Sequence, residues 1–309
     1  MKPLLPPPLA PGDRIGVAAP GGPVRREALD RGLAYLAARG YHPVAGRNLA
    51  RRHAYLAGDD RERLEDLNRL IADPAIRAVW FARGGYGSAR IVEGVDFAAL
   101  RRSPKALIGY SDVTVLQSAA WTEARLPTWH GPLVSELGDP ALFDETSLWG
   151  ALSGTATALS HAYPAASVAR PGAGEGLLLG GCLSILVSLV GTPYEPPLDG
   201  AVLFWEEVNE EPFRIDRMLG HLRLAGRLAK LQGMVVGRLV NCGAQDPLND
   251  MPLAEILETQ LAGTAFPVVV DFPAGHCAAK RTLPIGRMVR LDTAALRLAV
   301  TGAETANGR

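Results

Sequence analysis

The chain has 309 residues, with 32 basic and 32 acidic side chains, so its formal net charge is zero and its isoelectric point lies near 7.0. This balance provides no bulk attraction to nucleic acid or to an anionic membrane, because both need a basic excess. Hydrophobic residues make up 48% of the chain, which argues against disorder. The length exceeds the roughly 250 residues that a single core usually holds, so we expect one large domain or two smaller ones.

The expected compartment follows from the cysteines and the N-terminus. Cys182, Cys242 and Cys277 are scattered and form no CxxC pair, so neither a zinc ribbon nor a disulfide framework is readable. The first residues are broken by prolines and lack the apolar stretch of a signal peptide. The longest apolar run, residues 176–191, is shorter and richer in glycine than a transmembrane helix, which needs about 20 residues. We expect a cytoplasmic protein.

Strands and helices alternate through the first half of the chain, which predicts a doubly wound, mostly parallel sheet. Apolar runs and helical periodicity give the elements in this order: a strand at 14–20, helices at 24–39 and 59–73, a strand at 75–82, a helix from Ser88, a strand at 106–110 and a helix at 113–124. We assign residues 1–153 to an N-terminal α/β domain.

Residues 154–175 are small, polar and rich in proline and glycine, so we expect them to form a linker. Residues 176–309 then form a smaller C-terminal α/β domain. Its expected elements are strands at 176–179, 201–205, 234–240 and 268–272, helices from Leu183, at 215–231 and at 253–261, and a terminal hairpin of 287–291 with 296–300. We expect the tail after Gly302 to be frayed.

Two segments of the first half carry candidate chemistry. Ser111 lies between an apolar strand and a helix start, where a sharp turn can expose a nucleophile beside the positive end of the helix. The alternative is that Ser111 or Asp112 only caps that helix. Residues 83–87 (Arg-Gly-Gly-Tyr-Gly) follow a strand, and their glycines can turn N–H groups toward an anion, or can simply form a tight turn. The spacing is not that of a dinucleotide-binding loop.

Two further segments of the second half supply an acid and a base. Glu206 and Glu207 end an apolar strand, where a carboxylate can orient a histidine or can simply be exposed. His276 follows a glycine after a late strand, which suits a general base, although a lone histidine usually has a structural role. His42, His53, His161 and His221 receive that structural interpretation, and His130 stays undecided. No metal motif such as HExxH occurs, so we expect no metal and no cofactor.

Taken together, these segments resemble the LD-carboxypeptidase family of serine peptidases, which includes muramoyltetrapeptide carboxypeptidases and microcin C7 self-immunity enzymes. The resemblance spans nearly the whole chain and rests on several motifs in the right order. They are residues 11–20 (PGDRIGVAAP), 82–87 (ARGGYG), 108–112 (IGYSD), 130–132 (HGP), 180–181 (GG), 190–193 (VGTP), 212–217 (PFRIDR) and 275–276 (GH). It implies an N-terminal flavodoxin-like domain that carries the nucleophile and a C-terminal domain that carries the acid and the base.

The resemblance implies a catalytic triad of Ser111, Glu206 and His276, with an oxyanion hole made by the backbone N–H groups of Gly85 and Asp112. Neighbouring residues on a strand point to opposite faces, so only one of Glu206 and Glu207 can reach the histidine, and we assign Glu206. One departure is visible: many relatives have asparagine after the two glycines at 180–181, where this chain has Cys182.

The expected reaction is release of the terminal D-alanine from cytoplasmic murein tetrapeptide during peptidoglycan recycling, by a homodimer. Arg83, Tyr86 and Arg214 are candidates for binding the substrate, and an arginine suits its terminal carboxylate. Arg217 is also available. The alternative within the family is cleavage of a peptidyl-nucleotide amide, which the aromatic content of only 6% disfavours. An alternative of another class is a non-catalytic α/β binding protein, in which Ser111, Glu206 and His276 would not need to converge.

Overall fold

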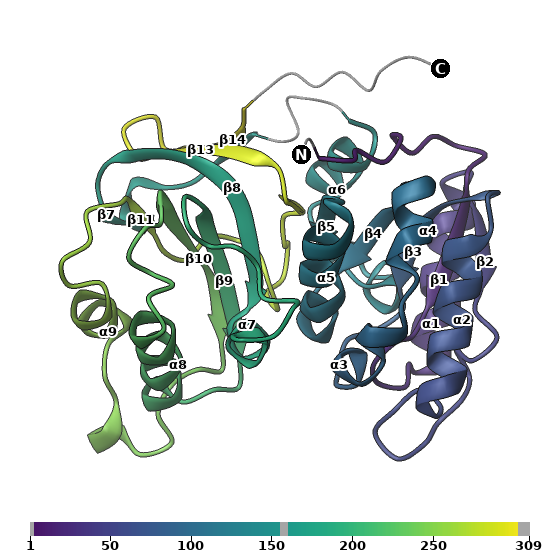
Figure 1. Ribbon diagram of the computed structural model, residues 1–309, viewed down its shortest axis with the longest axis horizontal. Helices are drawn as coiled ribbons and strands as arrows, with labels where there is room; N and C mark the ends of the chain where they lie inside the picture. The colour runs from purple at the N-terminus through teal and green to yellow at the C-terminus, as the bar shows by residue number, and fades with distance from the viewer. Residues whose placement is uncertain (1–2, 155–159, 302–309) are drawn as a thin grey trace.

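A computed structural model describes residues 3–154 and 160–301, which form two sheets side by side (Figure 1). The first sheet has the strand order β12-β5-β4-β3-β1-β2. Its members are β1 (Arg14–Ala18), β2 (His42–Ala45), β3 (Ile76–Phe81), β4 (Ala106–Gly109), β5 (Thr128–His130) and β12 (Leu283–Ile285). Strands β1 to β5 are parallel, in the flavodoxin-like order 2-1-3-4-5, which confirms the predicted fold class for this half.

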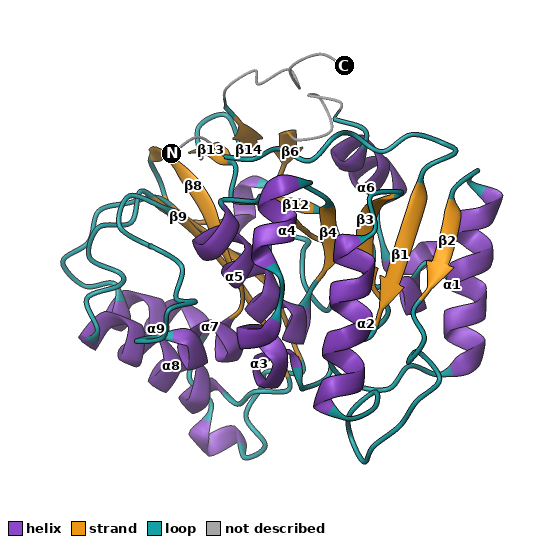
Figure 2. Cartoon of the chain, turned by 45° about the vertical axis from the view of Figure 1, so that its right-hand side comes forward, coloured by secondary structure: helices purple, strands orange, loops and turns teal. Residues whose placement is uncertain are grey.

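Helices cover both faces of the first sheet, as a parallel sheet with apolar strands requires. They are α1 (Arg26–Ala38), α2 (Asp60–Ala72), α3 (Ser88–Ile91), α4 (Phe97–Arg102), α5 (Thr114–Ala124) and α6 (Glu145–Leu152). Figure 2 shows α2, α4 and α5 together on one face, and their apolar side chains form one core with β3 and β4. Helix α2 begins at a capping box in which Asp59 accepts from the Glu62 N–H and the Glu62 side chain accepts from the Asp59 N–H.

The second sheet has eight strands in the order β6-β14-β13-β8-β9-β10-β11-β7. They are β6 (Ser160–Ala162), β7 (Val168–Arg170), β8 (Ala173–Cys182), β9 (Val202–Val208), β10 (Gly233–Val240), β11 (Val268–Val269), β13 (Met288–Asp292) and β14 (Arg297–Val300). Strands β8 to β11 are parallel, and β13 and β14 form the expected terminal hairpin. Helices α7 (Leu183–Leu189), α8 (Pro212–Leu224) and α9 (Leu253–Gln260) pack their apolar faces against this sheet.

The segment expected to be a linker, residues 154–175, contributes β6, β7 and the start of β8 to the second sheet. These strands are short and pair with partners far along the chain, β6 with β14 and β7 with β11, so no local apolar pattern indicates them. The expected helix at 215–231 ends at Leu224, and the tail after Gly302 lies outside the described residues.

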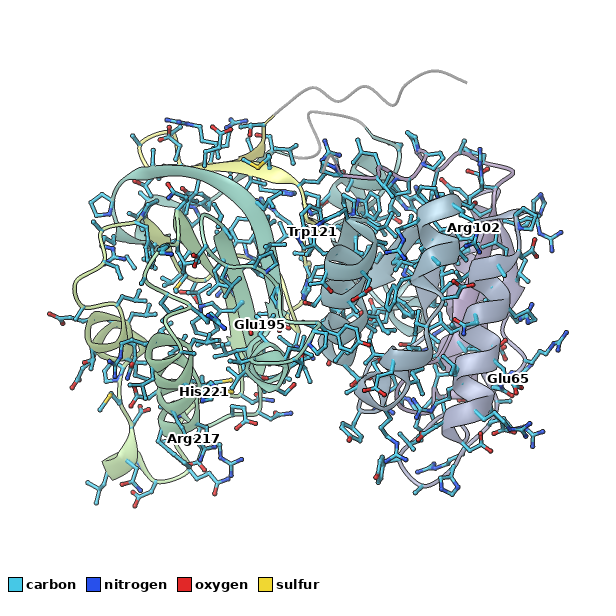
Figure 3. All side chains as sticks on the ribbon, viewed as in Figure 1. Glu65, Arg102, Trp121, Glu195, Arg217 and His221 are labelled. Carbon is cyan, nitrogen blue, oxygen red and sulfur yellow. The ribbon has the colours of Figure 1, made fainter. Side chains whose placement is uncertain are left out.

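Two elements join the halves. Strand β12 comes from the second half of the sequence but pairs antiparallel with β5 of the first sheet. Helix α5 is buried nearly all round, and its Trp121 packs into the core of the second half, between the two sheets in Figure 3. The carboxyl ends of β3 and β4 therefore face residues supplied by the second half.

Candidate active site

Ser111 lies on a sharp turn directly after β4. Its φ is +69°, a left-handed conformation that is strained for a residue with a side chain, while Tyr110 before it is extended. The turn leads through residues 111–113 into α5, and Ser111 is half-buried. This strand–turn–helix arrangement is the one that lifts a nucleophilic serine out of a sheet. Tyr110 and Val113 hold the N-cap positions of this turn and of α5, and neither carries a side-chain cap hydrogen bond, so Ser111 does not occupy a cap position here.

The glycine-rich loop after β3 lies against this turn. A β-carbon added to Gly84 would be 2.9 Å from Cβ and 3.0 Å from Oγ of Ser111, so the absence of a side chain permits the close approach. Gly85 has a φ of +101° and is exposed. Its N–H has no acceptor within the described residues.

Asp112 fixes the glycine-rich loop to the serine turn with its side chain. The buried carboxylate accepts hydrogen bonds from the Gly87 N–H (3.2 Å), the Ser88 N–H (2.9 Å) and the Ser88 hydroxyl (2.7 Å). Burial raises the pKa of Asp112, and the hydrogen bonds from Ser88 and Gly87 oppose that rise. The sequence predicted an oxyanion role for the Asp112 backbone or a helix cap by its side chain, and the bonds from this carboxylate to the glycine-rich loop were missed.

His276 is hydrogen bonded to both Ser111 and Glu206. Its Nε2 lies 3.1 Å from Oγ of Ser111, and its Nδ1 lies 2.7 Å from Oε2 of Glu206. The His276 backbone N–H also donates to this oxygen, over 3.3 Å. The side chain of His276 remains 18% exposed while that of Glu206 is fully buried. The serine end of this hydrogen-bonded triad therefore faces solvent, and the carboxylate end faces the core. The three residues come from the turn after β4, the end of β9 and the loop after β11.

The charge of Glu206 is stabilised by its neighbours. Burial alone would raise the pKa of this carboxyl, but the electrostatic influence of the neighbouring His130 and His276 rings outweighs burial and lowers the pKa to about 2. Glu206 is therefore ionised across the physiological range, and it can stabilise a proton on His276. Gly275, with a φ of +104°, allows the histidine to approach, because an added β-carbon would be 2.5 Å from Oε2 of Glu206.

Glu207 points away from His276. Its Oε2 accepts from the Ser184 N–H at the start of α7 over 2.7 Å, and its Oε1 accepts from the Val208 N–H at the end of β9 over 2.9 Å. The Cys182 thiol lies 3.4 Å from Oε1 of Glu207, and burial raises the pKa of that thiol well above its usual value. Cys182 therefore packs beside Glu207 as a neutral group, and its backbone N–H donates to the Thr114 hydroxyl of α5 over 3.1 Å.

A buried polar cluster beside the histidine was not predicted from the sequence. The Tyr110 and His276 rings pack edge to face at a centroid distance of 4.8 Å, and the Tyr110 hydroxyl donates to Oε1 of Glu136 over 2.8 Å. Lys280 donates to the same oxygen over 2.7 Å, and its side chain is only 2% exposed. Lys280 shares no motif with the other residues, so only the fold brings it to the site.

The predicted substrate-binding residues lie in two places, the glycine-rich loop and helix α8. Arg83 and Tyr86 flank the Gly84–Gly85 pair and are exposed, and Nη1 of Arg83 donates to the Pro23 carbonyl over 2.8 Å. Arg214 lies in the first turn of α8, where it pairs with Glu210 at 3.4 Å. Arg217 lies further along α8, on the side of the molecule formed by the second half (Figure 3). Arg83 and Tyr86 thus lie beside the serine turn, whereas Arg214 is engaged by a carboxylate.

The described residues contain no group of three or more histidine, cysteine or acidic side chains that could hold a metal ion. Within the same residues, no helix is long and apolar enough to span a membrane.

The sequence matches two family models, the LD-carboxypeptidase N-terminal domain over residues 15–131 and the LD-carboxypeptidase C-terminal domain over residues 175–291. A probable murein peptide carboxypeptidase of Bacillus subtilis is 36% identical over 286 residues, which cover 92% of this chain and 90% of that protein. The microcin C7 self-immunity protein of Escherichia coli is 29% identical, over 94% of this chain and 93% of that protein. The crystal structure of a muramoyltetrapeptide carboxypeptidase from Oxalobacter formigenes superimposes with a TM-score of 0.82 at 29% identity, over 94% of this chain and 100% of that one.

A two-sheet α/β fold with a serine on a strained turn, hydrogen bonded through a histidine to a buried carboxylate, defines a serine-type hydrolase. The two matched domains make the particular assignment: the chain belongs to the LD-carboxypeptidase family. This confirms the resemblance inferred from the motifs, and it disfavours a non-catalytic binding protein.

Proposed function

We propose that this protein is a carboxypeptidase that removes the terminal D-alanine from murein tetrapeptide, with Ser111 as nucleophile, His276 as general base and Glu206 as the acid of the triad. The observation that carries the proposal is the continuous hydrogen-bonded chain from Oγ of Ser111 through His276 to Oε2 of Glu206. The name of the Bacillus subtilis relative and that of the Oxalobacter formigenes structure support the substrate.

The reaction is acyl transfer in two steps. His276 takes the proton of Ser111 through Nε2 while the serine oxygen attacks the carbonyl carbon of the bond to D-alanine. His276 then passes this proton to the leaving amine. Water, deprotonated by the same nitrogen, hydrolyses the acyl-enzyme and restores Ser111. Glu206 accepts a hydrogen bond from Nδ1 of His276 throughout, which fixes the tautomer and stabilises the imidazolium.

Gly85 and Asp112 supply the N–H groups for the tetrahedral oxyanion in this proposal. Support comes from the free N–H of Gly85 and from the close packing of its loop on the Ser111 turn. A backbone donor in this role contributes about 3 to 4 kcal/mol to transition-state stabilisation. The Asp112 carboxylate, which binds the loop at Gly87 and Ser88, keeps the two donors in register.

The substrate carboxylate requires a cation near the oxyanion site. Of the candidates, we propose Arg83 with Tyr86, because both are exposed and flank the Gly84–Gly85 pair, whereas Arg214 already pairs with Glu210. An arginine can bind a carboxylate through two parallel hydrogen bonds, which gives an exopeptidase its preference for a chain end.

A peptidyl-nucleotide amide is the second candidate substrate, since the Escherichia coli relative is a microcin C7 self-immunity protein. An enzyme of that kind needs exposed aromatic rings to stack on the base. In the described part of the connection between the halves, Tyr163 is the only aromatic residue, and it is buried. The exposed pair Tyr55 and Tyr86, with ring centroids 5.8 Å apart, is the alternative platform. The murein peptide remains our first proposal because the names of the Bacillus subtilis relative and of the Oxalobacter formigenes structure point to it.

The physiological setting extends the same proposal. We infer a role in peptidoglycan recycling in the cytoplasm, and a homodimeric enzyme, from the family resemblance. Light scattering coupled to size-exclusion chromatography tests the dimer, and a monomer at working concentration would contradict it.

The deciding experiment is incubation of the purified protein with L-Ala-D-Glu-meso-diaminopimelyl-D-Ala. Mass spectrometry should detect loss of one alanine, and Ser111→Ala should bind the peptide without releasing it. A folded wild-type protein that releases no alanine but cleaves an aminoacyl sulfamoyl adenosine would transfer the assignment to the second candidate. Full activity of Ser111→Ala would refute the mechanism for both substrates.

A further inference from the structure

His130 is a buried histidine that the proposed mechanism does not yet use. It ends β5, between β4 and β12, where it pairs in register with Gly109 and Leu283. Its ring lies between two aromatic rings, with centroid distances of 4.9 Å to Phe204 and 5.5 Å to Tyr110. Its side chain is 2% exposed, so it contacts neither solvent nor a substrate directly. The sequence left its role undecided.

Nε2 of His130 lies close to Oε1, the second oxygen of Glu206. The two atoms are 3.7 Å apart, and neither has a hydrogen-bond partner within the described residues. The other Glu206 oxygen, Oε2, accepts from both the ring and the backbone of His276. A buried carboxylate oxygen without a donor is unfavourable, and so is a buried imidazole N–H without an acceptor. A shift of less than an ångström would pair the two atoms.

We propose that His130 is a positioning residue for catalysis: its Nε2–H donates to Oε1 of Glu206 and so holds this carboxylate, through Oε2, against Nδ1 of His276. The hydrogen-bonded chain then has four members, in the order Ser111, His276, Glu206 and His130. This inference rests on the proposed role of the triad. It requires only the neutral tautomer of His130 with its proton on Nε2.

The surroundings of Glu206 leave few other groups for this task. His276 and His130 are the two histidines beside it. The other titratable groups that respond to its charge are the Tyr110 hydroxyl and the thiols of Cys182 and Cys277. Burial raises the pKa of each of these three groups, so all of them stay neutral. The Lys280 cation is paired with Glu136, which also accepts from the Tyr110 hydroxyl. His130 is therefore the donor through which Glu206 can be held at both oxygens.

The test uses covalent labelling of Ser111 by a fluorophosphonate, which depends on the triad and not on the identity of the peptide. His130→Leu keeps an apolar shape but removes the donor, so the labelling rate should fall about 10- to 100-fold, the change that one hydrogen bond to a charged group gives. Loss of this donor should also raise the pKa of Glu206, because burial is then opposed by one hydrogen bond fewer. The acidic limb of the pH–rate profile should therefore move to higher pH.

His130→Gln and His130→Asn are the matched variants. The side-chain amide nitrogen of glutamine reaches the position of Nε2, so the glutamine variant should keep most of the labelling rate. The side chain of asparagine is too short to reach this position, so the asparagine variant should be labelled as slowly as the leucine variant. This contrast remains decisive if His130→Leu does not fold. Equal rates and equal acidic limbs for glutamine and asparagine variants, or a folded leucine variant labelled as fast as wild type, would overturn the role of His130. Failure of the wild-type protein to label at Ser111 would instead overturn the proposed nucleophile.

Discussion

Replacing Gly275 by alanine tests whether the precise position of Glu206 controls the reactivity of Ser111. The new β-carbon would lie 2.5 Å from Oε2 and 2.7 Å from Cγ of Glu206, where ordinary contacts are 3.4 Å or more. The carboxylate or the histidine loop must therefore move by about an ångström, and a displacement of about 1 Å at a catalytic group costs about 100-fold in rate. The 2.7 Å hydrogen bond between Glu206 and His276 would not survive such a movement.

The same change also affects stability. The φ of +104° at Gly275 strains any residue with a side chain, by about 1 to 3 kcal/mol, and the overlap adds about 1 to 3 kcal/mol. Gly12 is the matched control, since its φ is +95° and an added β-carbon would meet nothing within 4 Å. Gly12→Ala should therefore lose stability through strain alone and keep its activity.

The assay is the rate of fluorophosphonate labelling at Ser111, with urea unfolding measured on the same samples. We expect Gly275→Ala to be labelled about 100-fold more slowly than Gly12→Ala and to unfold at lower urea. If both variants were labelled at the wild-type rate, the position of Glu206 would not limit the reaction, and the geometric reasoning would be refuted.

Three further predictions concern the carboxylates and a buried histidine. Glu206→Gln should lower kcat by about 10⁴-fold, as loss of the acid does in other serine-histidine-acid triads. Glu207→Gln should lower the melting temperature and leave kcat near that of wild type. Equal kcat values for the two variants would show that the wrong glutamate was assigned. Asp112→Asn leaves the N–H groups of Gly87 and Ser88 with fewer acceptors, so it should destabilise the fold by about 1 to 3 kcal/mol and slow the labelling of Ser111. Unchanged labelling would contradict the role of Asp112 as the anchor of the glycine-rich loop. His161 is buried, which lowers its pKa from 6.5 to about 4; the unfolded chain therefore binds the proton first, and the free energy of unfolding should fall by up to about 3 kcal/mol between pH 6.5 and pH 4. His161→Gln should remove that part of the slope in urea titrations, and an identical slope would show that His161 is not the group responsible.

The sequence by itself determined the alternation of strands and helices, because apolar spacing and capping residues act over a few positions. It also identified Ser111, Glu206 and His276 as candidates, since each stands at or just after the end of an apolar strand. The motifs in order along the chain then reversed the structural interpretation of Ser111 and His276. The choice of Glu206 over Glu207 came from the resemblance, together with the alternation of side chains along a strand.

Only the tertiary structure decided the features that depend on distant partners. Ser111 and His276 are 165 positions apart and meet because β12 and α5 join the two halves of the chain. Strands β6, β7 and β12 are short segments stabilised by pairing with remote strands, so no local pattern indicates them. The anchoring by Asp112, the Lys280–Glu136 pair and the position of His130 beside Glu206 are contacts between buried polar side chains. Burial makes such contacts strong, and it is set by the packing of the whole chain.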